Sequence, residues 1–84
     1  MKPIRLSVHA QETAAFRGAT EADVVDAVRD APWLQARGGR LECKKDSSFE
    51  RLWNGRIYTT RQIRPIFVEE ADEIVVVTVY VYYF

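Results

Sequence analysis

The last eleven residues of the chain, Ile74 to Phe84, are almost all β-branched or aromatic. This run is too short to cross a membrane as a helix, which takes about 20 residues, and its composition favours a β-strand. Successive side chains of a strand point to opposite faces. One face therefore carries Val75, Val77, Val79 and Val81, and the other carries Ile74, Val76, Thr78, Tyr80, Tyr82 and Phe84. A strand that is apolar on both faces is usually central in its sheet and covered on both sides.

Two short helices are predicted in the first third of the chain. An alternating apolar pattern over residues 4–8 predicts a strand, and a helix over about residues 9–17 follows it and ends at Gly18. Thr20 has the chemistry of an N-cap, with Asp23 three residues later in the capping-box position. The second helix then shows one apolar stripe, made of Val24, Ala27, Val28 and Ala31.

From residue 40 onward the pattern has the two-residue period of strands. Asn54-Gly55 separates residues 49–53 from residues 56–60, and this dipeptide predicts a hairpin. Residues 63–69 form another strand, in which Pro65 requires an edge position or a bulge because it has no N–H to donate.

These elements predict a single α+β domain over residues 1–84 in the order β-α-α-β-β-β(-β). Two N-terminal helices pack on one face of an antiparallel sheet, and we expect the valine face of the last strand to meet them. The tyrosine face is left for a curled sheet, a second copy of the chain or a ligand.

Cysteine and histidine usage limits the chemistry and the compartment. The single cysteine, Cys43, cannot form an internal disulfide, which favours a reducing compartment and predicts a cytoplasmic protein. The chain opens without the pattern of a signal peptide, and no membrane segment is expected. One cysteine and one histidine do not make a zinc site, and there is no glycine-rich phosphate loop, so no metal or cofactor is predicted.

Charge is balanced overall but unevenly distributed along the chain. The net charge is zero, yet residues 33–64 carry eight basic and three acidic side chains, and residues 65–84 carry four acidic and no basic ones. The basic middle segment has two interpretations. It contacts phosphate groups of a ligand, or it is neutralised by the acidic part of the same chain.

Several short motifs resemble a family of uncharacterised small bacterial domains. The family pattern is HAxxRxxxRG, then a capped helix and a proline. The matching residues here are Ser7-Val8-His9-Ala10, Arg17-Gly18, Thr20-Glu21-Ala22-Asp23-Val24 and Ala31-Pro32. Thr13 stands where the pattern has its first arginine. The run from Ile74 to Tyr80 is similar to the V-T-V-Y strand that closes the family's domains.

Domains of this family resemble, at a distance, the RelE, ParE and BrnT toxins. The resemblance implies a RelE-like fold and a toxin that acts on RNA and is neutralised by a cognate antitoxin protein; other members of that superfamily inhibit gyrase. RelE-type cleavage relies on Arg, Lys and Tyr groups rather than a metal. The resemblance therefore implies a metal-independent endoribonuclease, and the catalytic candidates in this sequence are His9, Arg61, Arg64 and Tyr80.

His9 is the only side chain whose unperturbed pKa lies near neutrality. A helix places His9, Thr13 and Arg17 along one surface, where His9 can move a proton while arginines hold phosphate. The alternative is that His9 only fixes the junction between the first strand and the first helix.

Cations and aromatic residues alternate around the predicted hairpin. Cations that follow phosphates and aromatics that stack on bases are what single-stranded RNA binding needs. The RNA-binding candidates are Arg40, Lys44, Lys45, Trp53, Arg56 and Tyr58. The alternative for Trp53 and Tyr58 is cross-strand packing beside the turn.

Two functions remain at this point. The first is a RelE- or BrnT-like toxin, for which the arginines and lysines gather on one face near a tyrosine or His9. The second is a non-catalytic interaction module, which forms a homodimer or holds a protein partner through the Tyr80–Tyr82 face or the edge of the sheet.

Overall fold

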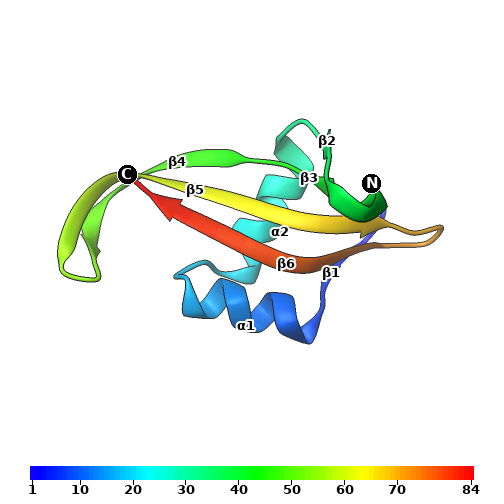
Figure 1. The fold of residues 1–84 in the computed structure, drawn as a ribbon, viewed down its shortest axis with the longest axis horizontal. Coiled ribbons are helices and arrows are strands. Elements are labelled where there is room, and N and C mark those ends of the chain that lie inside the picture. Colours follow the sequence, from blue (N-terminus) through cyan, green and yellow to red (C-terminus); the bar gives the residue numbers. More distant parts are fainter.

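A computed structural model describes all residues, 1–84, and contains two α-helices and one six-stranded sheet. This confirms the predicted α+β class (Figure 1). The elements in chain order are β1 (Ile4–Leu6), α1 (Val8–Phe16), α2 (Glu21–Asp30), β2 (Leu34–Gln35), the 3₁₀ turn η1 (Arg37–Gly39), β3 (Leu41–Glu42), β4 (Lys45–Trp53), β5 (Arg56–Glu69) and β6 (Ile74–Tyr83). Neither helix has the length and apolar character needed to cross a membrane.

The sheet has the strand order β1-β6-β5-β3-β2, and β4 pairs with β5 on the same side as β3. All pairings are antiparallel except that of β1 with β6, which is parallel. β3 and β4 share one register along β5, shown by the pairs Glu42↔Ile66 and Lys45↔Ile63. Pro65 lies opposite the break between them, because it has no N–H to donate to the ladder there.

The second helix begins and ends where the sequence predicts, whereas the first begins one residue early, because Val8, which was expected in the first strand, is the first residue of α1. Ser7 caps α1 by accepting a hydrogen bond from the Ala10 N–H at 3.1 Å, and Gly18 follows the helix with φ +85°. The predicted capping box of α2 is confirmed: the Asp23 N–H donates to the Thr20 hydroxyl, and the Thr20 N–H donates to the Asp23 carboxylate.

The core lies between the two helices and one face of the sheet. Alanines and valines of both helices meet fully buried side chains of β5 and β6, including Phe67, Ile74, Val76 and Val79. Trp33 closes one end of this core, with its ring edge-on to Phe67 at 5.0 Å between centroids. The opposite face of the sheet carries no helix. We call this surface, which includes Lys44, Gln62, Arg64, Thr78, Tyr80 and Tyr82, the helix-free face.

The predicted division of β6 into a valine face and a tyrosine face holds only for its second half. Val79 is buried in the core and Tyr80 and Tyr82 are exposed, as expected. In the first half Ile74 and Val76 are buried instead of the predicted Val75 and Val77. The reason is a β-bulge: Phe67 pairs with Val76 and Ile66 with Thr78, so Val77 is an extra residue that reverses the alternation.

Strand β1 pairs with only the first part of β6. Helix α1 lies beside the edge of β6 that continues beyond this pairing. The predicted helical stripe of His9, Thr13 and Arg17 faces this edge. The Thr13 hydroxyl accepts from the Val79 N–H at 3.3 Å, and the Arg17 guanidinium donates to the Val79 carbonyl at 2.6 Å. Side chains of α1 thereby pair backbone groups that would otherwise be open on a sheet edge.

The molecule is elongated, with extents of 42 × 24 × 23 Å. At one end the β4–β5 hairpin reaches beyond the end of β6, and the β5–β6 turn lies at the other end (Figure 1). Where the hairpin leaves the sheet, four rings form an aromatic cluster around Tyr83: Phe49, Trp53, Tyr58 and Tyr83.

Candidate nucleic-acid interface

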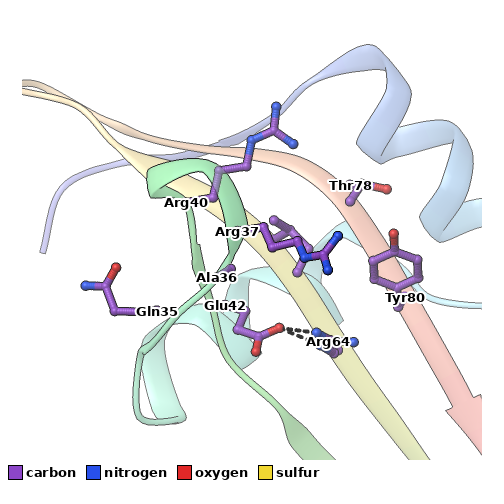
Figure 2. A pocket seen from close by; sticks show the side chains of 9 residues that line it. Gln35, Ala36, Arg37, Arg40, Glu42, Arg64, Thr78 and Tyr80 are labelled. Atoms are coloured by element: carbon purple, nitrogen blue, oxygen red, sulfur yellow. Dashed lines mark hydrogen bonds and ion pairs between the residues drawn. The ribbon is translucent and has the colours of Figure 1, made fainter.

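The helix-free face contains an open depression of about 600 Å³ (Figure 2). Its floor is formed by β5 and β6, and one wall by the segment that runs through η1. We call this the basic depression, defined by its lining residues Gln35, Ala36, Arg37, Arg40, Glu42, Arg64, Ile66, Thr78 and Tyr80. Arg40, Arg64 and Tyr80 of the predicted site residues meet here, and Arg37 joins them.

Arg64 lies on the floor and makes an ion pair with Glu42. Its Nε donates to Glu42 Oε2 at 2.6 Å, and its Nη1 donates to the Tyr82 hydroxyl at 3.3 Å. The hydrogen bonds to Tyr82 and Glu42 raise the pKa of Arg64 above its ordinary value, so the guanidinium stays charged. These contacts orient the guanidinium and leave its plane beside the Tyr80 ring, 5.6 Å from the ring centroid.

Arg37 and Arg40 enter the depression from η1. The turn between them is made by Gly38 and Gly39, with φ of +70° and +73°, a region that glycine occupies without strain. The Ala36 N–H donates to the Arg40 carbonyl at 2.9 Å and closes this small loop. Figure 2 shows Arg37 extending from the loop across β5 in the direction of Tyr80. Neither arginine forms an ion pair with a carboxylate.

Tyr80 is held between two cations and remains 39 % exposed. The Arg17 guanidinium, from the end of α1, lies 5.2 Å from its ring centroid, and Arg64 packs on it from β5. Two residues earlier on the same face of β6, Thr78 Oγ1 lies 3.4 Å from His9 Nε2. The imidazole is exposed beside Thr78, which lines the depression two residues before Tyr80.

The two predicted lysines lie on different faces. The register of β3 and β4 places Lys44 opposite Arg64, so it is exposed on the helix-free face beside the depression. Lys45 points to the helix side and pairs with Asp30 at 2.7 Å, which raises the pKa of Lys45. Lys45 is therefore separated from the predicted RNA-binding group.

The structure also separates Arg61 from the predicted catalytic group. Arg61 is three residues from Arg64 on β5 and so points to the opposite face of the sheet. Its side chain is only 12 % exposed, donates to the Gly18 carbonyl at 3.0 Å and pairs with Asp23 at 3.3 Å. It joins β5 to the loop between the helices, which is a structural role.

The hairpin aromatics predicted to stack on RNA bases pack instead on Tyr83 of β6. Trp53 stacks on Tyr83 with 5.0 Å between ring centroids and an angle of 24° between the planes, and Tyr58 tilts against Tyr83 at 5.8 Å. The Arg56 guanidinium lies 5.6 Å from the Tyr58 ring centroid. Both rings therefore pack within the protein as the alternative required, but on a third ring from β6 rather than on each other beside the turn.

Two contributors to the site were not identified from the sequence. The local sequence does not indicate that Arg37 reaches the site. The loop that carries Arg37 lies over β5 because β2 pairs with β3 and β3 pairs with β5. Arg17 was placed on the helical stripe, but its position against Tyr80 depends on how α1 crosses the edge of β6. The Arg-Gly-Gly-Arg sequence of residues 37–40 was the available hint.

Positive charge dominates this part of the helix-free face. Glu42 is the single carboxylate that lines the basic depression, and it forms an ion pair with Arg64. Five cations lie in the depression or directly beside it: Arg17, Arg37, Arg40, Lys44 and Arg64. Fixed cations around an open hollow attract phosphate groups and bind them with charge-assisted hydrogen bonds.

A second, smaller hollow of about 220 Å³ lies between α2 and β4. Its carboxylates, Asp23 and Asp26, face Lys45 and Arg61, and Asp23 is already committed to the cap of α2. No group of three or more His, Cys, Asp or Glu side chains gathers as a metal site in the structure.

No protein-family model, curated protein or solved structure matches this chain. The function is therefore inferred from the chemistry of the basic depression and its surroundings.

Proposed function

We propose that this chain binds single-stranded RNA in the basic depression and cleaves it without a metal, as a RelE- or BrnT-like toxin neutralised by a cognate antitoxin. One observation carries the proposal: Arg37, Arg40, Arg64 and Tyr80 line one open hollow, and Arg37 and Arg40 have no carboxylate partner. Cationic side chains without an intramolecular partner keep their charge available for an anionic ligand.

The contacts favour a phosphate group over a carboxylate-bearing ligand. Arg37 and Arg40 approach from the loop without a carboxylate partner, so their planar guanidiniums can present paired N–H groups to a phosphodiester. Arg64 lies on the floor and contacts Glu42 and Tyr82, so it adds positive charge beneath them. The depression is open at the surface, which suits a chain that passes through it rather than a small molecule enclosed by it.

The geometry suits cleavage of the RNA strand by its own 2′-hydroxyl. In this reaction the 2′-oxygen attacks the adjacent phosphorus, its proton goes to a base, and the 5′-oxygen leaves with a proton from an acid. His9 and Tyr80 are the groups at the site that can move these protons. Arg37 and Arg64 can stabilise the charge that develops on the phosphoryl oxygens.

The second candidate, a non-catalytic interaction module, is supported by the exposed side chains beyond Tyr80 on the same face. Tyr82 and Phe84 continue the row with exposures of 42 % and 57 %. A protein partner or a second copy of the chain could cover them, and the tests below include this outcome.

Binding and cleavage are tested separately. A fluorescent 2′-O-methyl oligouridylate cannot be cleaved by its own 2′-oxygen and reports binding alone by anisotropy. We expect wild-type protein to bind it at low salt. The double variant Arg37→Ala/Arg40→Ala should bind more weakly, with the slope of log affinity against log salt reduced by about 0.7 for each lost phosphate contact. Arg29→Ala is the matched control, because Arg29 is exposed on α2 away from the depression.

Cleavage is scored by growth and RNA integrity after induced expression. Wild-type protein should arrest growth and fragment RNA. His9→Ala and Tyr80→Phe should bind the methylated oligomer normally and lose cleavage, since each removes a proton-transfer group and no phosphate contact. Absence of RNA binding at low salt, or equal losses in Arg29→Ala and the double variant, would reject the proposed function. Binding without cleavage would leave an RNA-binding module and reject the nuclease.

A further inference from the structure

The aromatic side chains of the protein divide into those that are packed and those that are free. The chain has two tryptophans, four tyrosines and four phenylalanines. Four of these rings form the aromatic cluster, Trp33 packs on Phe67, and Tyr80 is held by two guanidiniums. Phe16, Tyr82 and Phe84 are left with neither an aromatic ring nor a guanidinium packed on them.

Two of the three free rings, Tyr82 and Phe84, follow Tyr80 along the chain and so extend away from the basic depression. Tyr80 and Tyr82 project from the same face of β6, and Phe84, one residue beyond the end of the strand, continues this alternation at a spacing of about 7 Å per two residues. The backbone of Phe84 is fixed by hydrogen bonds to Thr60 in both directions, at 3.0 and 2.8 Å. The rings are therefore exposed side chains on a rigid strand that leads directly out of the depression.

We propose that Tyr82 and Phe84 form a base-stacking track, on which the RNA bases next to the bound phosphates lie flat against aromatic rings. This inference rests on the proposed function and extends it, because it states which part of the substrate contacts β6. Free aromatic faces adjoining a cationic anchor are the combination by which single-stranded nucleic acids are held without sequence readout.

The charges beside the track distinguish base contacts from phosphate contacts. In the row of Tyr82, the Gln62 amide donates to Asp46 at 2.8 Å, and no basic residue lies in that row. The cationic anchor therefore ends at Arg64 and Lys44. Contacts beyond it should add affinity through stacking, with little change in salt dependence.

Oligomer length and salt dependence test the track. We compare 2′-O-methyl oligouridylates of two and six nucleotides by anisotropy, for wild type and Phe84→Ala. Phe84 is the cleaner target, because the Tyr82 hydroxyl also contacts Arg64. We expect Phe84→Ala to weaken binding of the six-nucleotide strand by roughly tenfold, to leave its salt slope unchanged and to leave binding of the two-nucleotide strand unchanged.

Two control variants isolate stacking. Phe84→Trp should retain or increase the affinity for the longer strand because it keeps a stacking surface. Phe16→Ala removes an even more exposed ring, 86 % exposed on α1, and should change nothing. Equal binding of the six-nucleotide strand by wild type and Phe84→Ala would overturn the track while leaving phosphate binding intact.

Two other outcomes also count against the track. If wild type binds neither strand, the proposed function fails and the track fails with it. If sedimentation shows that wild type is a dimer and Phe84→Ala a monomer, these rings are covered by a second copy of the chain and the track is rejected in favour of a protein interface.

Discussion

Arg61 and Arg64 lie three residues apart on β5 and have opposite environments. Arg61 is largely buried on the helix side, where it holds the Gly18 carbonyl and the Asp23 carboxylate. Arg64 is on the helix-free face, where Glu42 orients it beside Tyr80. At the scale of single residues, strand alternation therefore decides whether a guanidinium supports the fold or is available to a ligand.

At Gly18, both the backbone conformation and the neighbouring side chains restrict which residue can be accommodated. It has φ +85°, and a Cβ added there would lie 2.5 Å from the Tyr83 hydroxyl and 2.8 Å from the Trp53 ring. We expect Gly18→Ala to destabilise the protein by about 2–4 kcal/mol, from left-handed strain and overpacking together. Gly55→Ala is the control, because Gly55 has a similar φ of +83° and no neighbour within 4 Å. Chemical denaturation measures the free energy of unfolding of both variants. Equal losses of stability would show that the aromatic cluster does not restrict Gly18.

Helix α1 and strand β6 form a unit in which side chains of the helix replace a neighbouring strand. The parallel partner β1 pairs with β6 only as far as Val76, although β6 continues to Tyr83. Beyond that point the Val77 and Val79 carbonyls accept from Ser7 and Arg17, respectively. Open backbone groups on a strand edge invite pairing with other chains, and these contacts cover part of the edge.

Thr13 is the centre of this unit, because its hydroxyl accepts from the N–H of the buried Val79 and donates to the Ala10 carbonyl. Thr13→Val should cost about 1–3 kcal/mol by leaving the Val79 N–H without a partner. Thr13→Ser keeps the hydroxyl and should retain most of the stability. Hydrogen exchange at the Val79 amide provides the local measurement. Unchanged protection in Thr13→Val would contradict the role of the Thr13 hydroxyl as the partner of this amide.

On the scale of the whole molecule, the two faces of the sheet have different chemistry. The helix side contains the core and the ion pairs of Arg61 and Lys45, whereas the helix-free face is open and cationic around Tyr80. The net charge of the chain is zero, yet three arginines and a single carboxylate line the basic depression. A protein with such an arrangement can attract an anion locally without being basic overall.

Asp23 connects three parts of the fold and should make stability depend on pH. Burial alone would raise its pKa, but hydrogen bonds with Thr20 and the charges of Arg61 and Arg51 outweigh burial and lower the pKa below the ordinary 3.8. A lowered carboxyl pKa stabilises the fold above the ordinary pKa, and this contribution is lost as the pH falls through the folded-state value.

The comparison of wild type with Asp23→Asn tests this linkage. Wild type should be the more stable protein at pH 7, and the difference should shrink as the pH falls below about 4. Urea denaturation followed by tryptophan fluorescence measures both proteins across this range. A difference that stays constant from pH 7 to pH 3 would contradict the role of the Asp23 charge.

Much of the architecture could be predicted from local patterns. The capping box of Thr20 and Asp23, the stop at Gly18 and the Asn54-Gly55 hairpin each depend on residues a few positions apart, and the structure contains all three. Pro65 was expected on an edge strand or at a bulge, but it lies in β5, which has neighbours on both sides, and its missing N–H is accommodated by the break between β3 and β4. The bulge at Val77 was not predictable, because it depends on the register between β5 and β6 rather than on either strand alone.

The sequence by itself determined the α+β class, the two capped helices and the row of exposed aromatics on β6, because these follow from short-range periodicity and capping chemistry. The tertiary structure alone decided which cations meet: it brings Arg37 and Arg17 to Tyr80 and turns Arg61 and Lys45 away. The physical reason is that these positions depend on strand register, a bulge and the crossing of α1 over a sheet edge, which are set by packing between distant segments.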